Sequence, residues 1–375
     1  VGELFSLEQR ARMQGLFSGV WGVSSVIGPL IGGFLVDQIS WRWVFFINIP
    51  PGLLAITLVW LSWKGSAQAG KARAAVDYHG ALLLTAGVLA LLLGLEMLET
   101  PPGWVLLAAA AGLFIWFYRV ERRAADPILP FSLFRDRLFA VSIAHGVLVG
   151  WAMFGSVTFV PLFVQAVLGR SATEAGIALT PMSLAWTTAS IIGSPLLLKV
   201  GYRTLALAGM ALVTLGAFLM ASIGAGTGLV LVMAYLCLMG TGMGLCIPAF
   251  LIAVQSTVRR EDLGIATSTI QFSRSIGGTL GVSILGILLS ARFSSSLLKS
   301  GVDPSSVALD SLLDRFSGAA ASLGGPVREA LAGAVAGLFW AAFLVALAGL
   351  LVVLLAPRGM IAQLARERAA ERSAG

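Results

Sequence analysis

The sequence predicts an all-α polytopic membrane protein, and three observations support this fold class. Hydrophobic residues make up 58% of the 375 residues, whereas charged residues make up only 11%. The mean hydropathy is +0.92. About ten segments are long and apolar enough to span a bilayer, which takes about 20 predominantly apolar residues. Because a soluble domain carries about 25% charged residues, a water-soluble fold is excluded.

The predicted spans follow one another along the chain, separated by connections that carry most of the charge. They cover residues 14–36, 43–63, 79–98, 103–118, 138–167, 174–198, 203–224, 228–254, 264–291 and 331–356. Ser171 and Glu174 precede the sixth span with the spacing of a capping box at a helix N-terminus. We therefore expect the sixth helix to begin at this pair.

The first span is rich in small residues. Residues 15–33 contain six glycines, Pro29 and no charge. In water each interior Gly would cost roughly 1 kcal/mol and an interior Pro about 3 kcal/mol. In lipid, unpaired backbone groups are so costly that the segment stays helical, and small residues let another helix approach closely. We expect a helix that bends and makes tight contact with a neighbour.

Polar residues divide the spans into two groups. The third, fourth and tenth spans carry almost no polar side chain, so we expect them to face lipid or to lie at the periphery. The fifth, sixth, eighth and ninth spans each carry several polar groups at membrane depth, where such groups belong in a protein interior or a wet cavity. We therefore expect these four helices to surround a cavity, with the seventh outside them.

The net charge of +7 follows the predicted topology. Lys and Arg gather in every second connection and in the C-terminal tail, which the positive-inside rule assigns to the cytoplasm. This pattern predicts an even number of spans with both termini cytoplasmic. Since the basic residues are scattered over many loops, nucleic-acid binding is not expected. In the outer loop 291–330, Asp303 and Pro304 could start a short interfacial helix, and a flexible loop is the alternative.

Patterns of known catalytic sites are missing from the sequence. It contains no HExxH, GxSxG or CxxC and no cluster of His and carboxylates, so we expect no enzyme, no catalytic residue, no metal site and no cofactor. Nothing resembles a selectivity-filter loop, which argues against a channel. Cys237 and Cys246 fall on one predicted helix, too far apart along it to form a disulfide.

Several blocks of the sequence resemble a known family. The first span resembles the antiporter motif of the major facilitator superfamily, which lies in the fifth helix of drug exporters. The residues that carry the resemblance are Gly15, Ser24, Gly28, Pro29, Gly32 and Gly33. Ser24 stands where the motif has Gly. Four further blocks resemble the fourteen-spanner drug/proton antiporters of the EmrB/QacA type: DQISWRWVFFINIPPG (37–52), VDYHGALLLT (76–85), VPLFVQAVLGRSATEAGIALTPM (160–182) and QFSRSIGGTLGVSILG (271–286).

The resemblance implies a major facilitator fold in which the chain corresponds to helices 5–14. It divides the chain into the end of an N-terminal bundle (1–63), an inserted helix pair with linkers (64–136), a C-terminal six-helix bundle with the outer loop 291–330 (137–357), and a cytoplasmic tail (358–375). Because the chain begins at Val1 without a Met, we expect the natural protein to carry helices one to four before it. Proton-coupling carboxylates in this family often lie on those helices.

The function implied by the resemblance is proton-coupled antiport. Such a protein exports amphipathic drugs or small metabolites across the cytoplasmic membrane by alternating access, with the proton gradient as its energy source. Its implied partners are the lipid bilayer, a small amphipathic substrate, protons and, in a Gram-negative cell, a periplasmic adaptor. A dedicated exporter of one natural product and a fragment that does not transport are the alternatives.

Arg274 is the charge that the predicted spans place deepest in the membrane. It lies about 15 Å along its helix at 1.5 Å per residue, and an Arg at that depth costs about 2.5–3.5 kcal/mol. It is either a structural partner of carbonyls or a carboxylate, or a cavity-facing charge that acts on protons or an anionic substrate. The predicted lining of a substrate cavity comprises His145, Trp151, Phe154, Gln165, Met182, Trp186, Tyr235, Met239 and Gln271. Core or lipid packing would explain any one of the aromatic and Met residues in this set more simply.

Overall fold

The computed structural model describes most of the chain, and the described residues form helices and connecting turns. It describes residues 9, 13, 16–17, 19–20, 22–24, 27–28, 31–32, 35, 39–40, 42–62, 77–124, 127–129, 131–259, 261–303 and 325–359. The helices are α2 (Trp43–Phe46), α3 (Ile49–Ser62), α4 (Tyr78–Glu96), α5 (Pro101–Glu121), η1 (Leu133–Arg135), α6 (Arg137–Leu162), η2 (Phe163–Val167), α7 (Ala172–Val200), α8 (Tyr202–Met220), α9 (Leu229–Thr257), α10 (Leu263–Lys299) and α12 (Gly325–Leu354).

Within this described part, nine helical stretches are long and apolar enough to cross a membrane, which confirms the all-α membrane fold class. They coincide with the second to tenth predicted spans, counting α2 with α3 and α6 with η2 as one stretch each. About half of the first predicted span lies outside the described residues, and its described positions between 16 and 35 are helical. The linker 64–76 and the tail after residue 359 also lie outside them, as does Pro304 of the possible interfacial helix.

The predicted end of the ninth span is wrong. Helix α10 does not stop near residue 291 but continues to Lys299, which makes it about 55 Å long at 1.5 Å per residue. Leu285, Leu289, Phe293 and Leu297 are all buried at a spacing of four residues. This apolar stripe continues past the predicted end and packs the last turns of α10 against the bundle, so helical structure replaces the first part of the predicted outer loop.

Two other spans depart from a regular α-helix. The second span divides into α2 and α3 at Ile47 and Asn48, because Pro50 and Pro51 at the start of α3 lack the N–H groups that would continue the helical hydrogen bonding. The fifth span ends in the π-helical turn η2. The Arg328 side chain of α12 donates a hydrogen bond to the carbonyl oxygen of Val167 in that turn and ties the two elements together.

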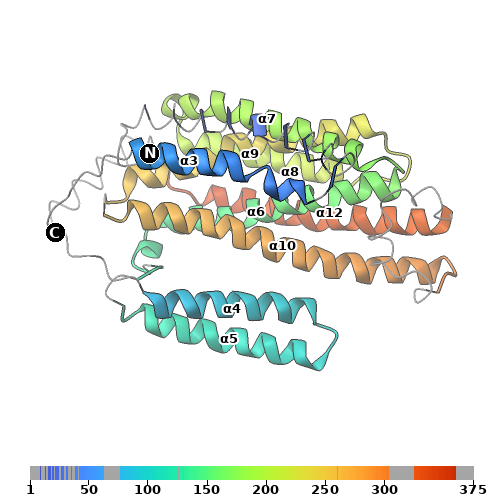
Figure 1. Cartoon of the computed structure of the whole chain (residues 1–375), viewed down its shortest axis with the longest axis horizontal. Coiled ribbons are helices and arrows are strands. Elements are labelled where there is room, and N and C mark those ends of the chain that lie inside the picture. Colours follow the sequence, from blue (N-terminus) through green and yellow to red (C-terminus); the bar gives the residue numbers. More distant parts are fainter. Residues whose placement is uncertain are drawn as a thin grey trace.

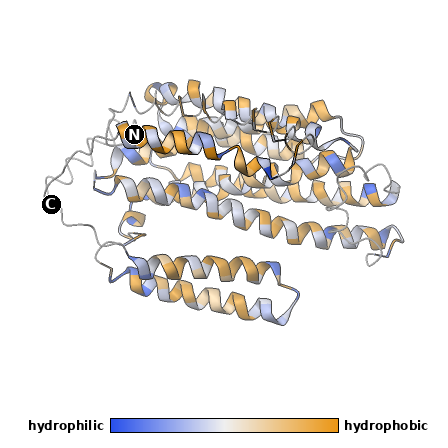
Figure 2. Cartoon of the chain, in the orientation of Figure 1, coloured by the Kyte–Doolittle hydropathy of each residue, from blue (hydrophilic) through white to orange (hydrophobic). Residues whose placement is uncertain are grey.

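Six of the described helices form one bundle, and two others form a separate hairpin. Within the bundle α6 packs on α10, α9 packs on both α7 and α8, and α12 packs on α6, α8 and α10. Helices α4 and α5 pair as a hairpin set apart from the bundle, with α10 as the nearest bundle helix (Figure 1). The hairpin is coloured as almost continuously hydrophobic, whereas α10 mixes apolar and polar residues (Figure 2).

The turn at each end of α7 follows local chemistry. Ser171 and Glu174 form the predicted capping box, with each side chain bonded to the backbone N–H of the other. At the other end Gly201 adopts a φ of 82°, a left-handed conformation that glycine enters without steric cost. Gly201 thereby reverses the chain directly into α8.

Two carboxylates meet at the open end of the α4–α5 hairpin, where α4 begins and α5 ends. Asp77 caps α4 by accepting a hydrogen bond from the Gly80 N–H (2.8 Å), and Glu121 Oε1 accepts one from the Leu129 N–H (2.5 Å). The remaining oxygens, Asp77 Oδ2 and Glu121 Oε2, lie within 2.8 Å of the position that a Cβ on Gly80 would occupy. Both oxygens are buried and have no hydrogen-bond partner among the described residues.

Candidate functional site

Helix α10 presents a polar face within a membrane-length span. Ser268, Gln271, Ser275 and Thr279 are all exposed and recur every three or four residues, the spacing that places side chains on one side of a helix. The most apolar window of this span nevertheless has a mean hydropathy of 1.6. Polar groups at membrane depth belong against a wet cavity or another protein surface rather than against lipid. This face of α10 is therefore the candidate site.

Arg274 lies beside this polar face. Its side chain is partly exposed, and the buried His145 of α6 and Cys246 of α9 lie close enough to interact with it electrostatically. No carboxylate of the described residues forms an ion pair with Arg274. The described residues therefore give no support to the interpretation in which Arg274 is the structural partner of a carboxylate.

His145 is packed inside the bundle, with 2% of its surface exposed. Its ring centroid lies 4.5 Å from that of Phe250 on α9, and Phe250 in turn contacts Tyr202 of α8 at 6.0 Å. His145 Nε2 is buried and has no hydrogen-bond partner among the described residues. In this conformation His145 lies in the packed interior with its ring against Phe250, and its role as a cavity-lining residue stays a prediction.

Glycines bring α6 and α10 into backbone contact. A Cβ on Gly150 would collide with the carbonyl oxygen of Arg274, and a Cβ on Gly277 would collide with the backbone of Val147. A Cβ on Gly146 would meet the hydroxyl of Ser273. Small residues at a helix contact allow this close approach. The backbone that carries Arg274 is thus fixed against α6 at three successive positions.

Helices α7 and α9 meet in the same way. Gly240 lies against the carbonyl oxygen of Met182, and Gly244 lies against that of Trp186. The Met182 side chain is 3% exposed and packs in the core in this conformation, and its role in lining a cavity stays a prediction. The Trp186 side chain is only partly buried and remains a candidate.

Met239 is also a core residue. Its side chain is fully buried against Gly216 of α8, and its sulfur lies 3.9 Å from the Ser156 hydroxyl of α6. In this conformation Met239 contacts α8 and α6, and its role in lining a cavity stays a prediction. Tyr235, one turn earlier on α9, is half-buried and stays a candidate.

The other predicted lining residues lie on α6, η2 and α10. The rings of Trp151 and Phe154 lie over Gly281 and Gly278 of α10, and both side chains are half-buried. Gln165 is half-buried in η2, with its amide bonded back to the Pro161 carbonyl oxygen at 3.4 Å. Gln271 is exposed on the polar face itself.

The first span touches α7 through a glycine that was not predicted. Gly22 is buried, and a Cβ there would collide with the Thr187 side chain. The helical spacing of Gly15, Gly19 and Gly22 is the sequence signal that would have identified this contact.

The described members of the motif make no such contact. A Cβ added to Gly28 or Gly32 would meet no atom of the described residues within 4 Å, and Ser24 is exposed. The tight contact expected along this helix therefore falls at Gly22 in this conformation, and not at Gly28 or Gly32. The remaining motif residues, Gly15, Pro29 and Gly33, lie outside the described residues.

Metal chemistry finds no support in the described residues. They contain no group of three or more His, Cys, Asp or Glu side chains arranged to hold a metal ion. The candidate site offers a guanidinium, hydroxyls, an amide and aromatic rings, which suit noncovalent binding.

Comparisons with known proteins identify the relatives of this chain. "Multidrug transporter protein MdtP" of Bacillus subtilis (strain 168) is 37% identical over 345 residues, which cover 90% of this chain and 63% of that protein. "Multidrug resistance protein 3" of the same strain is 35% identical over 79% of this chain and 58% of its own length. "Tetracenomycin C resistance and export protein" of Streptomyces glaucescens is 32% identical over 74% of this chain and 52% of its own length.

These relatives carry the names of transport and resistance proteins rather than of enzymes. The chain spans between about half and two thirds of their length. Residues 1–282 match the family profile described as Major Facilitator Superfamily. This match covers most of the chain, and the chain therefore belongs to the major facilitator superfamily.

Proposed function

We propose that the protein containing this chain is a proton-coupled antiporter that exports amphipathic drugs or small metabolites by alternating access. The observation that carries the proposal is the exposed polar face of α10 beside Arg274. Such a face needs a wet cavity or a partner surface, and transporters of this kind bind substrate near the membrane midplane between two bundles. The names of the relatives support export of drugs and antibiotics.

The proposed arrangement follows the fourteen-spanner antiporters. In it the chain corresponds to helices 5–14, with α4 and α5 as the inserted pair and α6 to α12 as the C-terminal bundle. The contact of Gly22 with Thr187 supports an interface between the first span and this bundle. The proposal also places the protein in the cytoplasmic membrane with a cytoplasmic C-terminus, as the distribution of Lys and Arg favours.

A transport assay in the full-length protein tests this function. Inside-out vesicles are energised, and a dye reports the pH gradient while candidate drugs are added. An antiporter releases protons from the vesicles when a substrate is added, and Arg274→Ala should slow this release at least about tenfold. Transport that persists after a protonophore collapses the gradient would contradict proton coupling. Proton release in response to a single compound would instead identify a dedicated exporter. The same assay on the present chain alone tests whether this chain transports by itself.

A further inference from the structure

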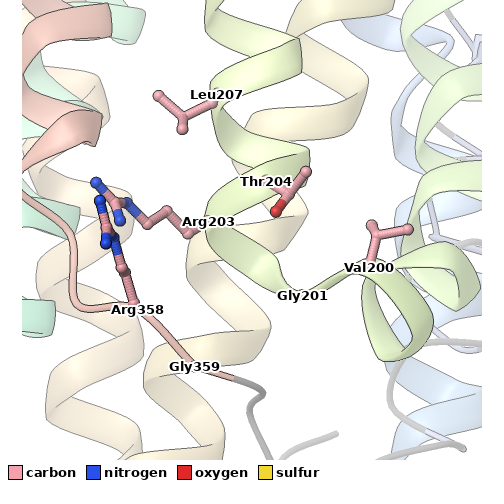
Figure 3. Close-up of a pocket in the computed structure, with 7 residues that line it drawn as sticks. All are labelled: Val200, Gly201, Arg203, Thr204, Leu207, Arg358 and Gly359. Carbon is pink, nitrogen blue, oxygen red and sulfur yellow. The ribbon is translucent and has the colours of Figure 1, made fainter.

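A pocket of about 400 Å³ opens where α8 begins and α12 has ended. This place lies at the ends of the membrane-spanning stretches, outside the polar face of α10. The residues that line it are Val200, Gly201, Arg203, Thr204, Leu207, Arg358 and Gly359. Figure 3 shows the side chains of Arg203 and Arg358 extending to the same side of the pocket, one from α8 and one from the segment after α12.

Hydrogen bonds from α6 and α8 hold the end of α12 that forms one wall. Arg203 donates to the carbonyl oxygen of Leu354 (2.6 Å), and Arg137 Nε donates to that of Leu355 (2.7 Å). The Tyr202 hydroxyl donates to the carbonyl oxygen of Pro357 (2.5 Å). The last carbonyls of a helix lack partners within the helix, so these bonds both satisfy them and fix the segment that carries Arg358.

The described residues that line the pocket include two positive charges and no negative charge. Neither Arg203 nor Arg358 forms an ion pair with any carboxylate that the structure describes. Arg203 Nε is buried and lacks a hydrogen-bond partner in the described chain. Two guanidinium groups in one pocket repel each other unless an anion lies between them. The N-terminus of α8 at Gly201, which no side chain caps, adds to the preference for an anion.

We propose that this pocket binds a phosphate-bearing anion, supplied by the headgroup of an anionic phospholipid. Guanidinium groups match phosphate oxygens in geometry and charge. Basic pockets between transmembrane helices at the membrane surface are suited to lipid headgroups. Val200 and Leu207 give the pocket apolar sides against which the glycerol and the first acyl carbons pack. This site is separate from the proposed transport function and does not depend on it.

The test measures lipid binding to the purified whole chain. The chain is placed in nanodiscs of phosphatidylcholine alone or with phosphatidylglycerol, and bound lipid is counted by native mass spectrometry after release into detergent. We expect phosphatidylglycerol to be retained by the wild type and to bind about fivefold more weakly to Arg358→Gln, since one basic contact near a membrane surface contributes about that much. Arg203→Gln should act in the same direction.

Two further arms make the result decisive. Arg259→Gln removes the same charge from the connection between α9 and α10, outside the pocket, and should retain phosphatidylglycerol like the wild type. Arg203→Gln also removes a hydrogen bond that holds the end of α12, so it could weaken folding. The Arg358 side chain makes none of the hydrogen bonds that hold this end of α12. Arg358→Gln therefore tests lipid binding independently of folding. Equal retention of phosphatidylglycerol by the wild type and by Arg358→Gln would show that this pocket is not the lipid site. If inorganic phosphate but not phosphatidylglycerol raises the thermal unfolding midpoint of the chain, the bound anion is free phosphate and not a lipid headgroup.

Discussion

Gly150 of α6 lies directly against the carbonyl oxygen of Arg274 in α10, with no room for a Cβ between them. Gly150→Ala should therefore push the two helices apart, and overpacking of this kind costs about 1–3 kcal/mol. We expect a fall of several degrees in the thermal unfolding midpoint of the chain in detergent. Gly286→Ala on α10 is the control, because its added Cβ would meet no atom within 4 Å. Equal midpoints for both variants would contradict this packing.

Arg274 is expected to act in transport and not only in folding. Since no described carboxylate pairs with it, Arg274→Ala should leave the unfolding midpoint nearly unchanged. Export by the full-length protein should fall at least about tenfold, the effect of losing about 1.4 kcal/mol at the rate-determining step. Arg274→Lys keeps the charge and should retain part of the activity. If Arg274→Ala exports normally and folds normally, both interpretations of this charge fail.

The motif glycine Gly28 should separate transport from stability. No described atom lies within 4 Å of the position that a Cβ on Gly28 would occupy, so Gly28→Leu should insert and fold like the wild type. We expect export to be lost, because the motif helix must approach its neighbour closely at another stage of alternating access. Gly22→Leu, by contrast, should lower stability, since Gly22 already lies against Thr187. An active Gly28→Leu protein would show that the motif glycine is dispensable.

The buried His145 side chain is expected to reduce stability. An unsatisfied buried polar atom costs about 1–3 kcal/mol, and His145 Nε2 has no partner within the described chain. His145→Leu should therefore unfold at the same temperature as the wild type or at a higher one. Ser142→Ala, one turn away, removes a hydroxyl that is bonded to the Leu138 carbonyl oxygen and should change the midpoint little. A marked fall for His145→Leu would mean that Nε2 has a stabilising partner.

The carboxylate pair of the hairpin gives a stabilising substitution. Glu121→Gln keeps the oxygen that accepts from the Leu129 N–H and adds an amide that can donate to Asp77 Oδ2. Two buried acceptors would then become a donor and an acceptor, so we expect a higher unfolding midpoint at neutral pH. Glu96→Gln, at the exposed far end of α4, makes the same chemical change without this contact. A lower midpoint for Glu121→Gln alone would mean that both charges are needed.

Properties that depend on neighbouring residues could be predicted from the sequence. The positions of nine spans followed from local hydropathy, because transfer into lipid sums over the residues of one segment. The capping box at Ser171 and Glu174 followed from residues three apart. The family followed from short blocks of residues that resemble its motifs. Mean hydropathy did not predict the end of α10, because the last turns of this helix are apolar mainly at every fourth position and polar between them.

Contacts between distant residues were decided by the tertiary structure alone. Each glycine in the sequence looks equally suited to close packing, but a Cβ is excluded at Gly22 and Gly150 and admitted at Gly28. Likewise, the sequence placed Met182 and Met239 on the right helices without showing that they face the core. The pocket joins Arg203 to Arg358, 155 positions later in the chain. The rotation and pairing of helices depend on how all their surfaces fit together, and no local pattern contains that information.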